Sequence, residues 1–295
     1  MQREGRREAR GRERWLGVGL VLLSAITFGS TAILARLAFA DGADEFTVLL
    51  ARFAIAGGVL LAVMIARRMP LPKPRVLLGL VLLGVLGRAG QGITFFNALE
   101  LAPAGLVALL TYLYPALVAL LAAVFLKDHL TPGRLLAVAI ALAGTALAVG
   151  PTGGGSPLGV VLSLATAVIY STYIVASSRV TRHTTAFVAS AVIVAATALP
   201  YAGIVAVRGY TPPRTLLGWG AIVAMALVST VAGTVAFFGG LKLVGPTATS
   251  ILSTFEPIWT VSLAALVLGE RLGPVQLLGG VLIVGAVVAL ASEKG

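Results

Sequence analysis

The sequence predicts an all-α membrane protein in which ten transmembrane helices form two inverted five-helix repeats. Of the 295 residues, 58% are hydrophobic and only 11% are charged, and the mean hydropathy is +1.01. Apolar runs of about 20 residues, the length that a helix needs to cross a hydrocarbon core of roughly 30 Å, follow one another with short breaks. An offset of about 142 residues relates the first five runs to the last five.

Each apolar run is interpreted as one membrane-spanning helix. The predicted spans are 16–38, 46–66, 75–98, 103–126, 133–150, 157–178, 185–207, 215–240, 246–268 and 274–291. Residues 1–15 form a basic segment that we expect to be a flexible cytoplasmic tail, and 292–295 form a second short tail. Because no small-residue cleavage site precedes the second span, we expect the first span to be retained.

The internal repeat keeps one register through motifs that differ in character. The aligned pairs are Phe95-Phe96 with Phe237-Phe238, Tyr114-Pro115 with Glu256-Pro257, Asp128 with Glu270, and Pro132 with Pro274. Each unit holds an odd number of spans, so the second unit must start from the opposite side of the membrane. Inverted repeats of this kind are typical of secondary transporters, because two related halves can expose a site at the midplane to each side in turn.

Basic residues predict the orientation, because Lys and Arg concentrate on the cytoplasmic side of membrane proteins. Most of them fall on the side of the N-terminus: Arg3, Arg6, Arg7, Arg10, Arg12, Arg14, Arg67, Arg68, Lys73, Arg75, Lys127, Arg134, Arg179, Arg182, Lys242 and Lys294. The opposite side has Arg36, Arg208, Arg214 and Arg271. We therefore expect a multi-pass membrane protein with both termini cytoplasmic, in contact with lipid and with no nucleic-acid partner.

The composition argues against an enzyme and against a bound cofactor. The chain has no cysteine, and its two histidines, His129 and His183, both fall in predicted loops, so no metal site is expected. Paired carboxylates or a Ser/His arrangement inside the spans are absent from the sequence. The glycines at 153–155 are not followed by Lys, so a phosphate-binding loop for nucleotide hydrolysis is not predicted.

The chain resembles the drug/metabolite transporter superfamily in its bacterial form with two EamA domains. The resemblance covers about residues 16–291 and rests on the duplicated ten-span layout, on Glu256-Pro257 followed by Leu268-Gly269-Glu270-Arg271-Leu272-Gly273-Pro274, and on Tyr114-Pro115 in the first half. The first half departs from the family pattern at Lys127-Asp128, where the family often has Gly-Glu. The resemblance implies repeats at 16–150 and 157–291 joined by a linker at 151–156, and a secondary transporter that exports amino acids or similar small metabolites.

Polar and aromatic residues recur at spacings of three and four inside several spans, which places them on one helix face. We expect these faces to line a central cavity for a small-molecule substrate. The candidate substrate-binding residues are Phe28, Arg88, Gln91, Phe95, Thr111, Tyr114, Tyr170, Tyr173, Thr230, Phe237 and Ser253. The alternative is that the hydroxyl groups bond to their own helix and that the tyrosines only pack.

Glu256 is the candidate for proton coupling, because ionisable residues within spans often serve in proton relays. Arg88 could bind a substrate carboxylate through two parallel hydrogen bonds. The alternative for both is a structural ion pair, or a carboxylate that stays protonated. Pro257 and Pro115 each remove a backbone donor and are expected to bend their helices beside the cavity.

An aromatic cavity with one cation and one anion suits a zwitterion with a flat or apolar side chain, so export of aromatic amino acids by alternating access is the favoured function. A passive channel or facilitator is the alternative. Arg36 and Arg52 are interpreted as lipid-facing or snorkelling side chains. Trp15 and Trp219 are interpreted as interfacial anchors, and Trp259 could face lipid, protein or the cavity.

The fifth and tenth spans lack polar faces and are rich in small residues. These residues are Ala137, Ala141 and Gly144 in one span and Gly279, Gly280 and Gly285 in the other. Because small residues allow close helix packing, we expect this pair to serve as a scaffold or as the contact of a homodimer, away from the substrate.

The predicted orientation can be tested by cysteine labelling, since the chain has no cysteine of its own. An impermeant maleimide added to intact spheroplasts should label Gly154→Cys, between the two repeats, and leave Arg7→Cys unlabelled until the membrane is opened. The reverse pattern would show that the positive-inside assignment is wrong.

Overall fold

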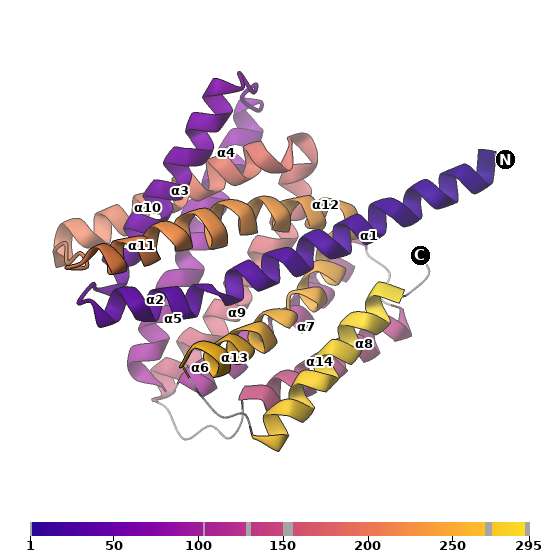
Figure 1. The fold of residues 1–295 in the computed structure, drawn as a ribbon. Coiled ribbons are helices and arrows are strands. Elements are labelled where there is room, and N and C mark those ends of the chain that lie inside the picture. The colour runs from indigo at the N-terminus through magenta and orange to yellow at the C-terminus, as the bar shows by residue number, and fades with distance from the viewer. Residues whose placement is uncertain (1, 103, 128–130, 150–155, 269–272, 293–295) are drawn as a thin grey trace.

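The computed structural model describes residues 2–102, 104–127, 131–149, 156–268 and 273–292, and within these segments the ordered elements are helical (Figure 1). This confirms the predicted all-α class. The predictions made for Asp128, His129, the linker residues 151–155, and Glu270 and Arg271 lie outside the described residues, as does Lys294.

The first repeat contains nine elements: α1 (Gln2–Gly29), α2 (Thr31–Ala40), α3 (Glu45–Ala66), α4 (Pro74–Leu82), the π-helical segment η1 (Leu83–Arg88), α5 (Ala89–Leu101), α6 (Ala104–Thr111), α7 (Tyr114–Leu126) and α8 (Pro132–Val149). The second contains eight: α9 (Pro157–Val180), the 3₁₀ segment η2 (Thr181–His183), α10 (Ala186–Arg208), α11 (Leu216–Ala224), the π-helical segment η3 (Met225–Ala232), α12 (Gly233–Leu252), α13 (Phe255–Leu268) and α14 (Pro274–Ser292).

Helical structure lies at every predicted span. By length and composition, 6 stretches in the described part of the chain could each cross a membrane: Gly11–Ala40, Glu45–Ala66, Pro74–Leu101, Pro157–His183, Ala186–Arg208 and Leu216–Leu252. The remaining predicted spans correspond to shorter apolar helices or to the end of the last stretch. Gly245 interrupts α12 with a φ of 80°, and this kink separates the eighth predicted span from the ninth.

Side chains at the helix starts explain where several helices begin. Asp44 accepts hydrogen bonds from the backbone N–H groups of Phe46 and Thr47 at the start of α3. Ser156, Thr185 and Thr215 do the same for α9, α10 and α11. These caps satisfy backbone N–H groups that the first helical turn leaves without partners. Leaving those groups unsatisfied would be costly near a membrane.

The N-terminal segment has helical structure. Residues 2–14, expected to be a flexible tail, continue α1 as one helix that projects beyond the bundle (Figure 1). The segment is rich in Arg and Glu, both good helix formers, and it has no proline, so the helix of the first span extends backward through it.

Helix packing follows the internal repeat. α1 packs on α12, and the repeat-related pair α9 and α5 pack on each other in the same way. α3 packs on α10, and α8 on α14, so each of these pairs joins a helix to its own repeat counterpart. A pseudo-two-fold axis that exchanges the halves produces this pattern, as expected for inverted repeats.

The small residues of the fifth and tenth spans allow α8 and α14 to pack on each other. A Cβ atom on Gly144 would lie 2.8 Å from a side-chain carbon of Ile283 and 2.9 Å from the carbonyl oxygen of Gly279. The helix backbones therefore touch at this point. Figure 1 shows this pair at one edge of the bundle, away from α3 and α10, as a scaffold would be.

A similar close approach joins α3 to α10 at Gly57. A Cβ atom on Gly57 would lie 2.8 Å from the Cα atom of Ala195, whereas one on the neighbouring Gly58 would meet nothing within 4 Å. Gly57 is therefore required by the contact between the repeats, and Gly58 is a matched control on the outer face.

We expect Gly57→Ala to destabilise the protein by about 1–3 kcal/mol, because the added methyl group must push two helix backbones apart. Gly58→Ala should be neutral or slightly stabilising, since alanine is the better helix former. Thermal unfolding of both variants in the same detergent measures the difference. Equal unfolding temperatures would contradict the packing described for α3 and α10.

Candidate functional site

Two π-helical segments occupy equivalent positions in the two repeats. η1 ends at Arg88, and Thr230, the residue related to it by the repeat, lies in η3. The Thr230 hydroxyl donates a hydrogen bond to the carbonyl oxygen of Met225, five residues earlier, as π-helical geometry allows. Short π-helical insertions are frequent at functional sites because they alter the direction of the side chains that follow.

The fourth and ninth spans are interrupted where the sequence predicts bends. α6 ends at Thr111 and α7 begins at Tyr114, while α12 ends at Leu252 and α13 begins at Phe255. Pro115 and Pro257 stand in the first turn of the new helices, where their missing N–H groups cannot continue the preceding helix. Irregular backbone at such depth is tolerated where protein surrounds it or it lines a cavity.

Arg52 was interpreted from the sequence as a lipid-facing or snorkelling side chain, and this interpretation is wrong. The residue is 4% exposed, and its Nε atom donates a hydrogen bond of 2.6 Å to the hydroxyl oxygen of Thr230. Its guanidinium carbon lies 5.2 Å from the centre of the Phe53 ring. The side chain thus points into the bundle, where a hydroxyl group and an aromatic face compensate its burial. Arg36, by contrast, is exposed.

Arg88 lies beside the same ring. Its guanidinium carbon is 5.7 Å from the centre of Phe53, and its Nη1 atom donates a hydrogen bond to the side-chain oxygen of Gln91. Tyr201 stacks on Phe53 with the ring centres 5.7 Å apart. The guanidinium groups of Arg52 and Arg88 therefore both lie beside one phenyl ring that the sequence did not single out, and Gln91 is bonded to Arg88.

Glu256 stands in the first turn of α13 and is partly buried. The positive charges of Arg88 and Arg52 both act on its carboxylate. Within the described part of the chain, no hydrogen bond or ion pair involves that carboxylate. The structural ion pair considered as an alternative is thus not formed at contact distance in this part of the chain.

Aromatic rings from both repeats form a continuous chain. The ring centres of Phe28 and Phe237 are 6.3 Å apart, and those of Tyr114 and Tyr170 are 4.8 Å apart. The links between them are Phe237 to Phe238 at 5.5 Å, Phe238 to Tyr173 at 6.4 Å, Tyr173 to Tyr170 at 6.0 Å, and Tyr114 to Tyr112 at 6.0 Å. The charges of Arg88 and Glu256 both act on Tyr170, which connects this chain to the charged group.

The remaining predicted site residues are placed differently. Thr111 and Ser253 are buried at the ends of α6 and α12, next to the two helix breaks, and the Thr111 hydroxyl has no partner among the described residues. Phe95 instead packs edge-on against Phe96 and contacts an apolar cluster at Ala98 and Ala102. The structure therefore groups the predicted residues other than Phe95 around the charges, the breaks and the aromatic chain.

The orientation of Trp259, left open by the sequence, is toward the first span. Its Nε1 atom donates a hydrogen bond of 2.9 Å to the Ser30 hydroxyl, and Thr260 donates to the carbonyl oxygen of Gly29. Gly29 and Ser30 mark the junction of α1 and α2, and a Cβ atom on Gly29 would lie 2.9 Å from the carbonyl oxygen of Glu256. This glycine lets α13 approach closely and so fixes the position of Glu256.

One buried and one partly buried guanidinium group, a partly buried carboxylate and a set of aromatic rings can hold a small zwitterion in three ways at once. The guanidinium groups suit a carboxylate, the Glu256 side chain suits an ammonium group, and the rings suit an apolar side chain. An all-helical fold of apolar helices in two related repeats is the architecture of a membrane transporter.

The chain belongs to the EamA-like transporter family, whose profile matches residues 15–150 and again 157–292. A solved crystal structure is similar over 92% of this chain and 95% of its own, with a TM-score of 0.81 and 25% sequence identity. The fold and the repeat are therefore those of the family that the sequence resembles.

Among curated proteins, the chain is 34% identical over 178 residues to a protein named aromatic amino acid exporter YddG from Ancylobacter novellus. The matched region covers 56% of this chain and 62% of that protein. The match thus spans less than two thirds of that relative's length. The chain is also 27% identical over 287 residues to the uncharacterized transporter YcbK of Bacillus subtilis, covering 91% of this chain and 90% of that protein.

We expect Arg52→Lys to lower the stability of the protein by about 1.5–3 kcal/mol, because the hydrogen bond from Nε to Thr230 is lost while a buried charge remains. Arg67→Lys, at the exposed end of α3, is the control and should have little effect. Thermal unfolding in detergent provides the measurement.

Thr230→Val completes the test as a double-mutant cycle with Arg52→Lys. If the two residues interact as described, the two changes together should cost less than the sum of each alone. Additive effects would contradict the contact.

Proposed function

We propose that this protein is a secondary transporter that exports amino acids, with aromatic ones favoured, or similar small metabolites across the bacterial inner membrane by alternating access. The family supplies the class of protein, and the site supplies the class of substrate. Both termini are proposed to be cytoplasmic, so that export runs from the side of the basic loops to the side of the α2–α3 turn.

The observation that carries the proposal is the grouping of Arg52 and Arg88 around Phe53, within electrostatic range of Glu256. Placing three charges within apolar spans is expensive, and such residues usually face a substrate or ion pathway. A substrate carboxylate can bridge the two guanidinium groups, because arginine binds carboxylates through parallel hydrogen bonds. The substrate ammonium group then neutralises Glu256.

The preference for aromatic side chains rests on the rings near this charged group. Tyr170 and Tyr173 stack with a ring distance of 6.0 Å and an angle of 13°, and Tyr114 meets Tyr170 edge-on. A flat apolar side chain can extend such a stack, which contributes about 0.5–1.5 kcal/mol for each ring pair beyond the buried area. The printed name of the YddG relative, an aromatic amino acid exporter, agrees with this preference.

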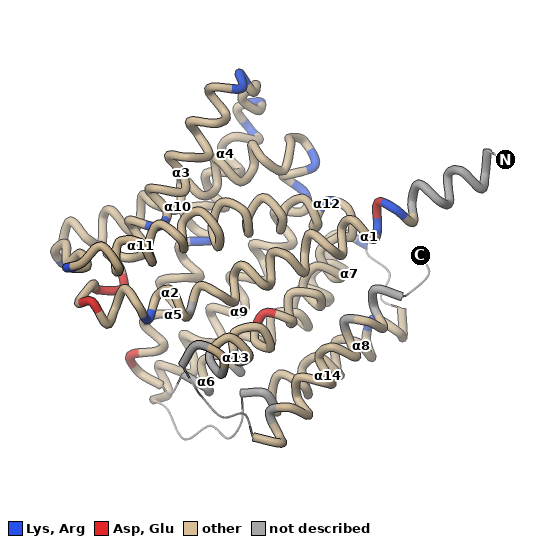
Figure 2. The backbone as a smooth tube through the Cα atoms, viewed as in Figure 1, with Lys and Arg blue, Asp and Glu red and all other residues tan. Residues whose placement is uncertain are grey.

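The proposed orientation is consistent with how charges are distributed over the bundle. Figure 2 marks acidic residues along the backbone near the α2–α3 turn and basic residues near the α3–α4 turn at the other end. Because basic residues favour the cytoplasmic side, the α2–α3 turn is proposed to face the periplasm.

Transport by reconstituted protein tests the proposal. Proteoliposomes should accumulate labelled phenylalanine, tyrosine or tryptophan when a pH gradient is imposed, and accumulation should fall when the gradient is dissipated. Uptake that equilibrates without responding to the gradient would instead favour the passive facilitator. No flux of any amino acid would overturn the proposed substrate class.

Glu256→Gln tests the coupling role, because glutamine keeps the shape of the side chain but cannot bind and release a proton. We expect gradient-driven accumulation to be lost while binding and counterflow exchange of the same amino acid remain measurable. A variant that transports and responds to the pH gradient like the parent would remove Glu256 from the coupling mechanism.

A further inference from the structure

A cavity lies at one end of the bundle, apart from the residues of the central site. It has a volume of about 460 Å³, within the range of roughly 300–1,000 Å³ that is typical of small-molecule pockets. The α2–α3 turn, the end of α5 and the segment after α10 form its walls. Its lining residues are Phe39, Ala43, Asp44, Glu45, Phe46, Glu100, Arg208, Gly209 and Thr211.

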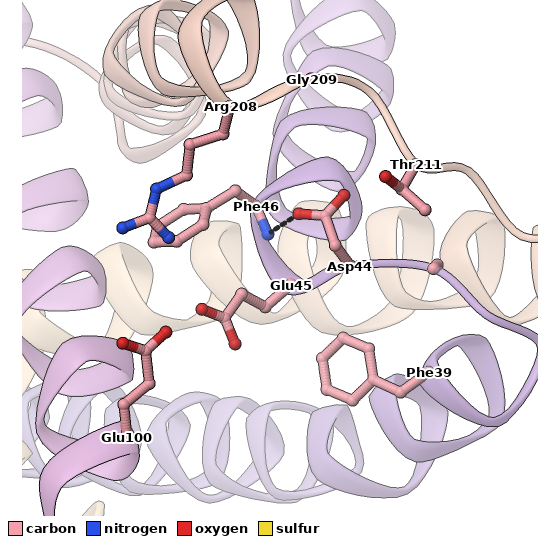
Figure 3. A pocket seen from close by; sticks show the side chains of 9 residues that line it. Phe39, Asp44, Glu45, Phe46, Glu100, Arg208, Gly209 and Thr211 are labelled. Carbon is pink, nitrogen blue, oxygen red and sulfur yellow. Dashed lines mark hydrogen bonds between the residues drawn. The ribbon is translucent and has the colours of Figure 1, made fainter.

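Two carboxyl groups face each other across this cavity. Figure 3 shows the side chains of Glu45 and Glu100 pointing toward each other from α3 and α5. The charges of Glu100 and Arg208 both act on Glu45. Two carboxylates this close repel each other, so a cationic group placed between them is favoured.

Arg208 is positioned on one wall rather than between the carboxyl groups. Its guanidinium carbon lies 4.8 Å from the centre of the Phe46 ring, and Figure 3 shows it over that ring. Asp44 is engaged through one carboxylate oxygen in capping α3. With Asp44, Glu45 and Glu100 against Arg208, the lining is net acidic.

The wall formed by the segment after α10 is fixed by hydrogen bonds to the start of α3. The backbone N–H of Thr211 donates to the Thr47 hydroxyl at 3.0 Å, and the carbonyl oxygen of Thr211 accepts from the N–H of Asp44 at 3.1 Å. Thr215 donates from both its N–H and its hydroxyl group to Asp41, at 2.7 and 3.0 Å. The cavity is therefore preformed, which lowers the cost of binding a ligand.

The cavity and the central site lie along the same helix faces. Glu45 and Arg52 are separated by two turns of α3, about 10 Å, and so are Phe46 and Phe53. On α10, Arg208 and Tyr201 have the same separation, with Arg208 over Phe46 and Tyr201 on Phe53. At each of these two positions along the helices, a guanidinium group lies over a phenylalanine ring and a carboxyl group lies nearby.

We propose that this cavity is a second, outer binding site for an amine-bearing substrate, with the ammonium group between Glu45 and Glu100 and the apolar part against Phe39. The proposal extends the proposed function: the ligand would occupy this site after leaving Glu256 and before release. Its chemistry requires a primary amine but no carboxylate, since the one cation in the lining already lies over an aromatic ring.

Binding of labelled phenylethylamine to the purified full-length chain in phosphatidylglycerol nanodiscs tests the outer site. This probe has an ammonium group and a ring but no carboxylate, and the lipid carries no amine. In a Glu256→Gln background, binding should persist, and adding Glu45→Gln and Glu100→Gln should weaken it about tenfold or more, because a charge-assisted contact is lost. Glu13→Gln, which removes an exposed carboxylate outside the cavity, is the matched control and should leave binding unchanged.

The outcomes separate the outer site from the proposed function. Unchanged phenylethylamine binding after both glutamine substitutions would overturn the outer site, whatever Glu256→Gln does. Loss of binding with Glu256→Gln alone would also overturn it, because all binding would then be central. If instead only the outer substitutions matter in the parent background, the outer site stands and the amine contact proposed for Glu256 fails.

A single variant and a second lipid composition serve as further controls. Glu100→Gln alone, at an exposed helix end, should keep the fold and still weaken binding. The outer site can therefore be tested even if the double variant misfolds. Nanodiscs of phosphatidylethanolamine should bind the probe as well as phosphatidylglycerol ones. Strong inhibition there would show that a lipid amine occupies the cavity and would overturn its role as a substrate site.

Discussion

A charge held inside a bilayer must find its partners within the protein, because lipid offers none. Three such charges, Arg52, Arg88 and Glu256, lie within the spans of this chain, and much of the surrounding structure serves them. Thr230 accepts the Nε hydrogen bond of Arg52, and Phe53 presents its ring to both guanidinium groups. The interrupted ninth span places the carboxylate within their electrostatic range.

The scaffold is symmetric, and the charges are not. The π-helical segments, the helix breaks and the helix pairs recur in both repeats. The charged residues of the site have uncharged counterparts in the other repeat: Arg52 with Val194, Arg88 with Thr230, and Glu256 with Tyr114. Duplication thus accounts for the backbone framework, whereas the substrate chemistry proposed for it depends on substitutions made in one half at a time.

The fold was predictable because two signals in the sequence are long-range and redundant: apolar runs of spanning length and a repeat register kept by prolines and paired aromatics. Most of the predicted site residues gather for the same reason, since spacing by three and four fixes a helix face. Arg52 was missed because its sequence surroundings are apolar and its partner, Thr230, is distant in the chain. The π-helical segments have no local sequence signal. The positions and directions of the Arg88 and Thr230 side chains therefore could not be derived from the sequence.

The two ends of the bundle differ in a way that bears on how a transporter of this kind would work. At the basic end, Arg179 donates a hydrogen bond to the carbonyl oxygen of Phe125 and Lys242 to that of Thr184, which ties α9 to α7 and α12 to the turn before α10. At the acidic end, the outer cavity separates α5 from the α2–α3 turn. Because the repeats are inverted, exchanging their conformations would separate the helices at the basic end and close the cavity at the acidic end. The breaks and π-helical segments, present in both halves, are where the backbone can make that exchange with the fewest helical hydrogen bonds broken.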